Sequence, residues 1–167
     1  MRGNSRIFSV CVVAVGVGLA AFAATGCSPT DPSPGPAALD ESSAAEGADT
    51  NSNGVRDDID KVISQAPVTA EMRLYLTETA QVTERIMALD VDGDQQAARD
   101  VAYEIASDSN RLTSCPPAGV DVDEAFLQSE NLDFLILNTV EREAQYAAFS
   151  KLIDGRAFPE PTCEGSN

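Results

Sequence analysis

Apolar residues recur at helical spacing from residue 55 almost to the end of the chain. Between Val55 and Ala66 they share one face of a short helix, which Pro67 ends because proline cannot continue a helix. Thr69 is placed to cap a longer helix, whose apolar seam advances by three and four residues in turn. The seam consists of Met72, Tyr75, Thr79, Val82, Ile86 and Leu89. The Asp90–Asp94 stretch then breaks the pattern and predicts a turn.

A third helix follows, with Asp94 as its cap and Cys115-Pro116-Pro117 at its end. The segment 121–128 favours one or two helical turns. The last long segment runs from about 129 to 154, with a cap or kink at Asn138-Thr139. No alternating stretch is long enough to predict a strand. We therefore expect an all-α fold, a small helical bundle of three long helices plus one or two short ones, after a disordered tether.

The N-terminal pattern is different from that of the helical part. Arg2 and Arg6 precede an uncharged apolar run of 18 residues, Ile7 to Ala24, and Thr25-Gly26-Cys27 follows. A basic start, an apolar centre and small residues before the cysteine are typical of a secretory signal. Residues 28–48 read SPTDPSPGPAALDESSAAEGA, a composition without an apolar period that predicts an extended tether.

The stretch Ala24-Thr25-Gly26-Cys27 resembles the lipobox of bacterial lipoproteins, although that family usually has leucine where Ala24 stands. The resemblance implies a signal peptide over 1–26 that is cut before Cys27, and acylation of Cys27 (palmitate among the acyl chains) as the membrane anchor. Ser28 then implies the outer membrane, on its periplasmic face, more than the inner membrane. An ordinary cleaved signal and an uncleaved transmembrane helix are the alternatives. The remaining segments would be the lipidated tether at 27–48, a loop at 49–60 and the helical domain at 55–167.

The charge balance argues against partners with many negative charges. Removing residues 1–26 from 167 leaves 141, enough for one domain and its tether. The loss of Arg2 and Arg6 leaves nine basic residues against 27 acidic ones, a formal charge of −18. Such a chain would repel nucleic acid and anionic lipid, and it would attract a cation or a basic envelope protein. The alternative, which we favour, is that the acidic surface serves only solubility in a salty or crowded compartment.

Two residue types restrict the chemistry further. The chain has no histidine, which removes the commonest general base and metal ligand, so we expect no enzyme activity. Cys115 and Cys163 are the cysteines left after the signal and the anchor, and an exported chain meets an oxidising compartment. We expect them to form a disulfide across 48 residues; zinc binding is the alternative, but two thiolates do not complete a zinc site.

Residues 49–60 match a twelve-residue calcium loop position by position. Calcium takes six to eight oxygen ligands, which such a loop supplies from positions 1, 3, 5, 7, 9 and 12. Those positions are Asp49, Asn51, Asn53, the Val55 carbonyl, Asp57 and Asp60. Gly54 occupies position 6, where the chain must turn sharply. The pattern predicts a structural Ca²⁺ site with a dissociation constant on the order of 10⁻⁴–10⁻³ M.

This loop resembles those of thrombospondin type 3 repeats and dockerins, which also end in aspartate. A full EF-hand has glutamate at position 12 and a helix on both sides. The alternative is a turn rich in Asp and Asn that caps a helix, with Asp57 and Asp58 interacting with the helix dipole. The Asp90–Asp94 stretch lacks a glycine at the right offset and has Ala97 where an oxygen ligand is needed, so it predicts only a helix–helix turn.

Three functional hypotheses follow. The combination of signal, spacer, loop and helical domain, including Leu135–Phe149, resembles uncharacterised envelope lipoproteins, a resemblance that implies no activity. The absence of histidine, the tether and the acidic surface favour a membrane-tethered, non-catalytic interaction module. The second is a periplasmic inhibitor or immunity-type protein that binds a basic partner. The third is a carboxylate-dependent enzyme, which we disfavour because the spacing places most of its candidate acids on a solvated face. Those acids are Glu130, Asp133, Glu141 and Glu143.

Overall fold

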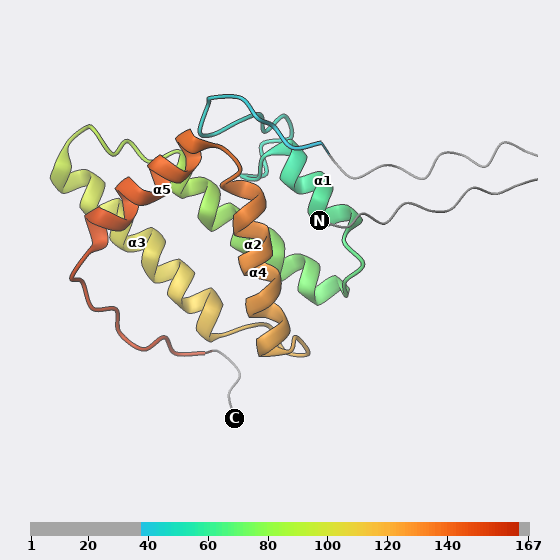
Figure 1. Ribbon diagram of the computed structural model, residues 1–167. Helices are drawn as coiled ribbons and strands as arrows, with labels where there is room; N and C mark the ends of the chain where they lie inside the picture. The colour runs from blue at the N-terminus through green and yellow to red at the C-terminus, as the bar shows by residue number, and fades with distance from the viewer. Residues whose placement is uncertain (1–37, 164–167) are drawn as a thin grey trace, which may run out of the picture. The chain divides into compact units, whose positions relative to one another are not determined.

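The computed structural model describes residues 38–163, and the predicted signal peptide and Cys27 lie outside this range. All regular secondary structure within it is helical, which confirms the predicted all-α fold. The five helices are α1 (Asp57–Gln65), α2 (Ala70–Met87), α3 (Gln95–Ser114), α4 (Val122–Ile136) and α5 (Val140–Ile153) (Figure 1). None of these helices is long and apolar enough to cross a bilayer.

Four of the five helices begin at a side chain that accepts a backbone N–H of the first turn. Thr69 accepts the amide of Met72, and Asp94 accepts two amides at the start of α3. Asp121 and Thr139 do the same for α4 and α5. These groups satisfy amides that have no partner within the helix. The predicted caps Thr69 and Asp94 are thereby confirmed.

The structure differs from the sequence prediction between residues 121 and 154. The predicted turns at 121–128 and the first part of the predicted last helix form one helix, α4, because nothing interrupts the backbone ladder near Ser129. The chain then breaks at Leu137–Thr139 and restarts as α5, since Thr139 accepts the amide of Arg142 at 3.3 Å, which confirms the cap or kink predicted at Asn138-Thr139. The bundle therefore has four long helices and one short one.

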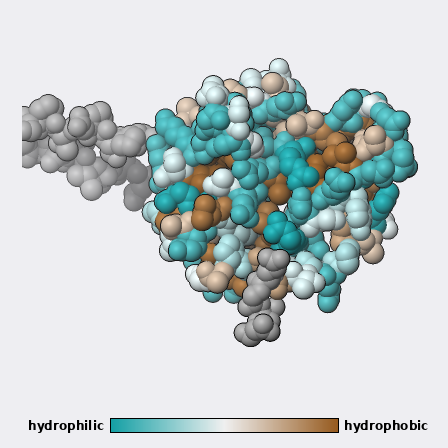
Figure 2. Space-filling view, turned by 180° about the vertical axis from the view of Figure 1, so that it is seen from behind, coloured by the Kyte–Doolittle hydropathy of each residue, from teal (hydrophilic) through white to brown (hydrophobic). Residues whose placement is uncertain are grey.

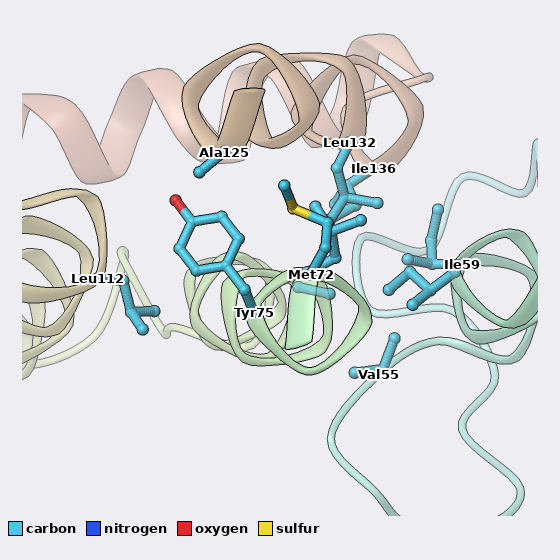
Figure 3. Close-up of a cluster of buried hydrophobic side chains, with 11 residues drawn as sticks. Val55, Ile59, Met72, Tyr75, Leu112, Ala125, Leu132 and Ile136 are labelled. Atoms are coloured by element: carbon cyan, nitrogen blue, oxygen red, sulfur yellow. The ribbon is translucent and has the colours of Figure 1, made fainter. Parts of the chain in front are cut away.

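Helix α2 is the centre of the bundle and packs against all four other helices. Figure 3 shows Tyr75 of α2 pointing toward Ala125 of α4, with Leu112 of α3 on one side. Val55 and Ile59 approach α2 from the other side (Figure 3). A second cluster joins the C-terminal end of α2 to α3 and α5. Because α2 has neighbours on more than one side, it buries residues outside the predicted seam as well: Leu76, Ala80, Thr83 and Met87.

The end of the predicted tether is part of the folded domain. Residues 38–48 contain no helix, yet Leu39 packs against the core and two backbone carbonyls, at Ala44 and Ala45, accept hydrogen bonds from Arg142 of α5. Asp40 also forms an ion pair with Arg142, at 3.2 Å. The prediction of a flexible tether up to residue 48 was wrong for this part, because composition does not show a distant arginine that binds the backbone.

The C-terminal segment after α5 runs back along α3. The ring of Phe158 stacks on Tyr103 with centroids 5.0 Å apart, and Asn110 donates a hydrogen bond to the Pro159 carbonyl. Cys163 then meets Cys115 at the end of α3, where the two form a disulfide with a Cα–Cα distance of 5.4 Å. This arrangement agrees with the pairing predicted from the sequence.

Candidate functional site

The loop at 49–60 is built from short-range hydrogen bonds between side chains and backbone. The Asp49 carboxylate accepts the amides of Asn53 at 3.2 Å and Gly54 at 2.9 Å. The Asn53 side chain accepts the Val55 amide, also at 2.9 Å. Gly54 has φ +80°, a conformation that costs other residues energy because of their Cβ. The sharp turn predicted at position 6 of the loop is therefore present.

The predicted calcium ligands lie on this turn, but their carboxylates are not gathered around one point. Asn51 donates a hydrogen bond to Asp60 at 3.1 Å, which joins positions 3 and 12 of the loop. The Asp57 carboxylate accepts hydrogen bonds from the amide and the hydroxyl of Thr50, at 2.9 and 3.1 Å. Across residues 38–163, no three acidic or thiol groups are close enough together to hold a metal ion as they stand. The loop brings Asp49, Asn51 and Asn53 onto one turn and ties Asp60 to it, whereas Asp57 faces Thr50.

The loop is attached firmly to the helical domain. Val55, at position 7, is fully buried in the core beside Ile59. Gln81 of α2 donates a hydrogen bond to the Asn53 carbonyl at 2.8 Å, and the Asp57 amide bonds to Ala48 at 2.7 Å. The loop is therefore connected to α2 by a hydrogen bond and to the core by Val55.

Beside the loop lies a buried group of charges that the sequence analysis did not find. Arg56 is 2% exposed, and its guanidinium lies 2.7 Å from Asp58. It also donates a hydrogen bond to the Ile136 carbonyl at the end of α4. Glu84 of α2 faces it at 3.9 Å, and the Oε1 atom of Glu84 has no hydrogen-bond partner. In the sequence, this group is indicated only by the position of Arg56 directly before Asp57 and Asp58. The same position is equally typical of an arginine exposed to solvent.

The pKa values of the two acids beside Arg56 shift in opposite directions. Burial raises the pKa of Glu84 to about 7, against the weaker effect of Arg56 and Arg142. The pKa of Asp58 is lowered although burial opposes the shift, because Arg56 and two backbone amides bind its charged form. Glu84 therefore exchanges its proton near neutral pH, while Asp58 stays ionised.

A second candidate site lies between α4 and α5. It is an open hollow of about 250 Å³ lined by Glu130, Asp133, Phe134, Leu137, Glu143 and Tyr146. Asp133 accepts a hydrogen bond from Thr83 at 3.1 Å, and its burial raises its pKa. The pKa of Tyr146 is also raised, by burial and by the nearby Asp133. With acids and aromatic rings in its wall, this hollow suits a cation.

The four acids that the carboxylate-enzyme hypothesis named are only partly brought together. Glu130, Asp133 and Glu143 line the hollow, whereas Glu141 is exposed and does not line it. Asp94 of the Asp90–Asp94 stretch is used as the cap of α3, in agreement with its prediction as a turn.

Comparison with known proteins returned no match, whether with protein-family models, curated proteins or solved structures.

Proposed function

We propose that this chain is a lipid-anchored, non-catalytic binding module of the bacterial cell envelope, with a loop at 49–60 that binds Ca²⁺ as a structural ion. Cys27 and the apolar run before it support the anchor. The observation that carries the calcium site is the turn itself: Asp49, Asn51 and Asn53 lie on it, and Asp60 joins it through Asn51.

Calcium would act here by stabilising the start of the domain. Bound to the loop, it would reduce the repulsion among Asp49, Asp57 and Asp60 and hold the chain that leads into α1. A ligand that binds only the folded chain stabilises it by RT ln(1 + c/Kd) at free concentration c, which is about 0.4–1.4 kcal/mol for 1 mM calcium at the predicted dissociation constant. Because Val55 is buried and Gln81 holds the loop, this stabilisation would extend to α2.

The test is a melting curve of the full chain in non-ionic detergent, with millimolar calcium and with chelator. We expect calcium to raise the melting temperature of the wild type, and Asp49→Ala with Asp57→Ala to abolish the rise. The matched control is Asp90→Ala with Asp92→Ala, which removes two exposed acids outside the loop and should keep the rise. An unchanged wild-type curve would mean that the loop is only a polar turn.

The anchor is tested separately by fractionating cells. Cys27→Ala should move the protein out of the membrane fraction after a carbonate wash. Retention of the variant in the membrane would show that another feature holds the protein there.

The second candidate function is that of an inhibitor or immunity-type protein for a basic envelope partner. The hollow between α4 and α5 favours it, because three of its six lining residues are acidic. A pull-down from envelope extract at low and high salt tests this function, since binding through charge weakens as salt rises.

A further inference from the structure

Helix α4 is apolar on two faces, and only one of them is covered. Its buried face packs against α2 through three residues: Ala125, Leu132 and Ile136. Four large apolar side chains lie elsewhere on its surface in solvent: Val122 (59% exposed), Phe126 (51%), Leu127 (56%) and Phe134 (80%). At 100° per residue, the exposed set spans about 140° of the helix, centred far from the buried set.

Four of the eight large apolar residues that are exposed between residues 38 and 163 belong to α4. Figure 2 shows the molecule from behind, relative to Figure 1. This side is mostly hydrophilic, with hydrophobic residues visible between polar ones. On α4, by contrast, Val122, Phe126 and Phe134 follow one another at intervals of four and eight residues along a single helix. These exposed apolar side chains, between which Glu130 also lies, form a stripe that marks an interaction surface.

The hollow between α4 and α5 continues the stripe. Phe134 belongs to both, and Tyr146 of α5 supplies a second aromatic ring. Glu130, Asp133 and Glu143 add three carboxylates, and no basic residue lines the hollow. An ammonium or guanidinium group is attracted both by aromatic faces and by carboxylates.

We propose that the exposed face of α4 and the adjoining hollow bind a basic amphipathic helix of a partner protein, with one arginine or lysine side chain in the hollow. Apolar side chains of the partner would cover Phe126 and Phe134, as an amphipathic helix does in an apolar groove. This inference rests on the proposed function as a binding module, and names the surface and the chemistry of the partner.

Charge argues against the other occupants. A second copy of this chain would bring Glu130 and Glu143 against the same acids, at a cost in repulsion. An anionic membrane surface is repelled for the same reason. The chain between Cys27 and the described range, residues 28–37, reads SPTDPSPGPA and supplies neither basic nor large apolar side chains.

The test uses the full chain in non-ionic detergent and a fluorescent synthetic helix with leucines on one face and arginines beside them. Binding is followed by anisotropy. Two variants address the surface: Phe134→Ser, and Glu130→Gln with Glu143→Gln. Their matched controls lie on α2: Leu74→Ser, at a side chain 66% exposed, and Glu71→Gln with Glu78→Gln, which removes the same charge. Since all these positions are exposed, each variant should keep the wild-type circular dichroism.

We expect both surface variants to bind on the order of tenfold more weakly than the wild type, and both controls to bind within about twofold of it. A peptide with serine in place of leucine should bind more weakly than the parent peptide. No binding of the parent peptide, or an equal loss in surface variants and controls, would overturn the proposal. A wild-type dimer in sedimentation that Phe134→Ser converts to a monomer would also overturn it, by assigning the face to a second copy.

The outcome is separable from that of the proposed function. The calcium response and the membrane fractionation are read on the same protein without the peptide. If the calcium response or the membrane association is absent while the peptide still binds, the proposal of the calcium loop or of the anchor is wrong. The proposal of the docking surface then still holds. Intact calcium and fractionation results with no peptide binding would remove only the docking surface.

Discussion

Replacement of Glu84 by glutamine should make the protein more stable at neutral and alkaline pH. Glu84 is 10% exposed in its side chain and lies 3.9 Å from Arg56. Its Oε1 atom has no hydrogen-bond partner, so the protein does not replace the hydrogen bonds to water that the carboxylate loses on burial. Glutamine has almost the same shape and keeps an amide oxygen that can face Arg56. Arg56 itself retains its ion pair with Asp58 at 2.7 Å.

The sign of the pH dependence follows from the raised pKa. Glu84 has a pKa of about 7 in the folded chain against an ordinary value of 4.5. Between these two values the folded state holds the proton and the unfolded state does not, so stability falls as pH rises through this window. The difference in pKa corresponds to about 3 kcal/mol. Solvent near the carboxylate screens part of this, and we expect an observed gain of about 1–3 kcal/mol for Glu84→Gln above pH 7.

The measurement is urea unfolding of wild type and Glu84→Gln at pH values from 4 to 8, with chelator present so that the neighbouring loop holds no metal. The two free energies of unfolding should converge near pH 4 and diverge above pH 5. Asp40 and Asp58 have lowered pKa values, so they contribute little to the pH dependence above pH 5. Glu78→Gln, at an exposed position of α2, is the control and should follow the wild type. A constant difference across this range, or a less stable Glu84→Gln at pH 8, would refute the reasoning.

Three further predictions concern long-range contacts. Arg142→Met should lower the free energy of unfolding by about 3 kcal/mol and speed hydrogen exchange in residues 40–45, because the fully buried guanidinium binds their carbonyls; equal exchange rates would contradict this. Removing the Cys115–Cys163 disulfide, by changing both residues to serine, should cost about 4 kcal/mol for the loop that it closes, as read by urea unfolding of the two forms. Ile136→Ala should cost about 2–5 kcal/mol, since Ile136 is 0% exposed; a loss under about 1 kcal/mol would show that the core is loosely packed there.

Local patterns in the sequence determined the helices and most of their ends. Thr69 and Asp94 cap their helices as predicted, because a cap depends on residues within three positions along the chain. The turn at Gly54 is equally local, because its positive φ depends only on the backbone of that residue, which glycine tolerates. The disulfide was predictable because only two cysteines remain once Cys11 and Cys27 are assigned to the signal and the anchor.

Contacts between distant residues were decided only by the tertiary structure. Several helix ends are completed by side chains from other helices or loops. Arg73 donates to carbonyls in and just after the last turn of α1, and Gln145 of α5 donates to two carbonyls at the end of α2. Arg56 donates to a carbonyl at the end of α4. Arg142 and its partners in residues 40–45 are about a hundred positions apart in the chain.

The sequence pattern also did not indicate that a helix such as α2 is buried on more than one side. A periodic seam shows one face of a helix, but α2 contacts four helices and buries Ala80 and Thr83 as well. Conversely, Phe134 is a large apolar residue that is 80% exposed, at the edge of an open hollow. Periodicity reports which residues share a face, whereas only the packing of helices determines which faces are covered, because that depends on contacts far apart in the chain.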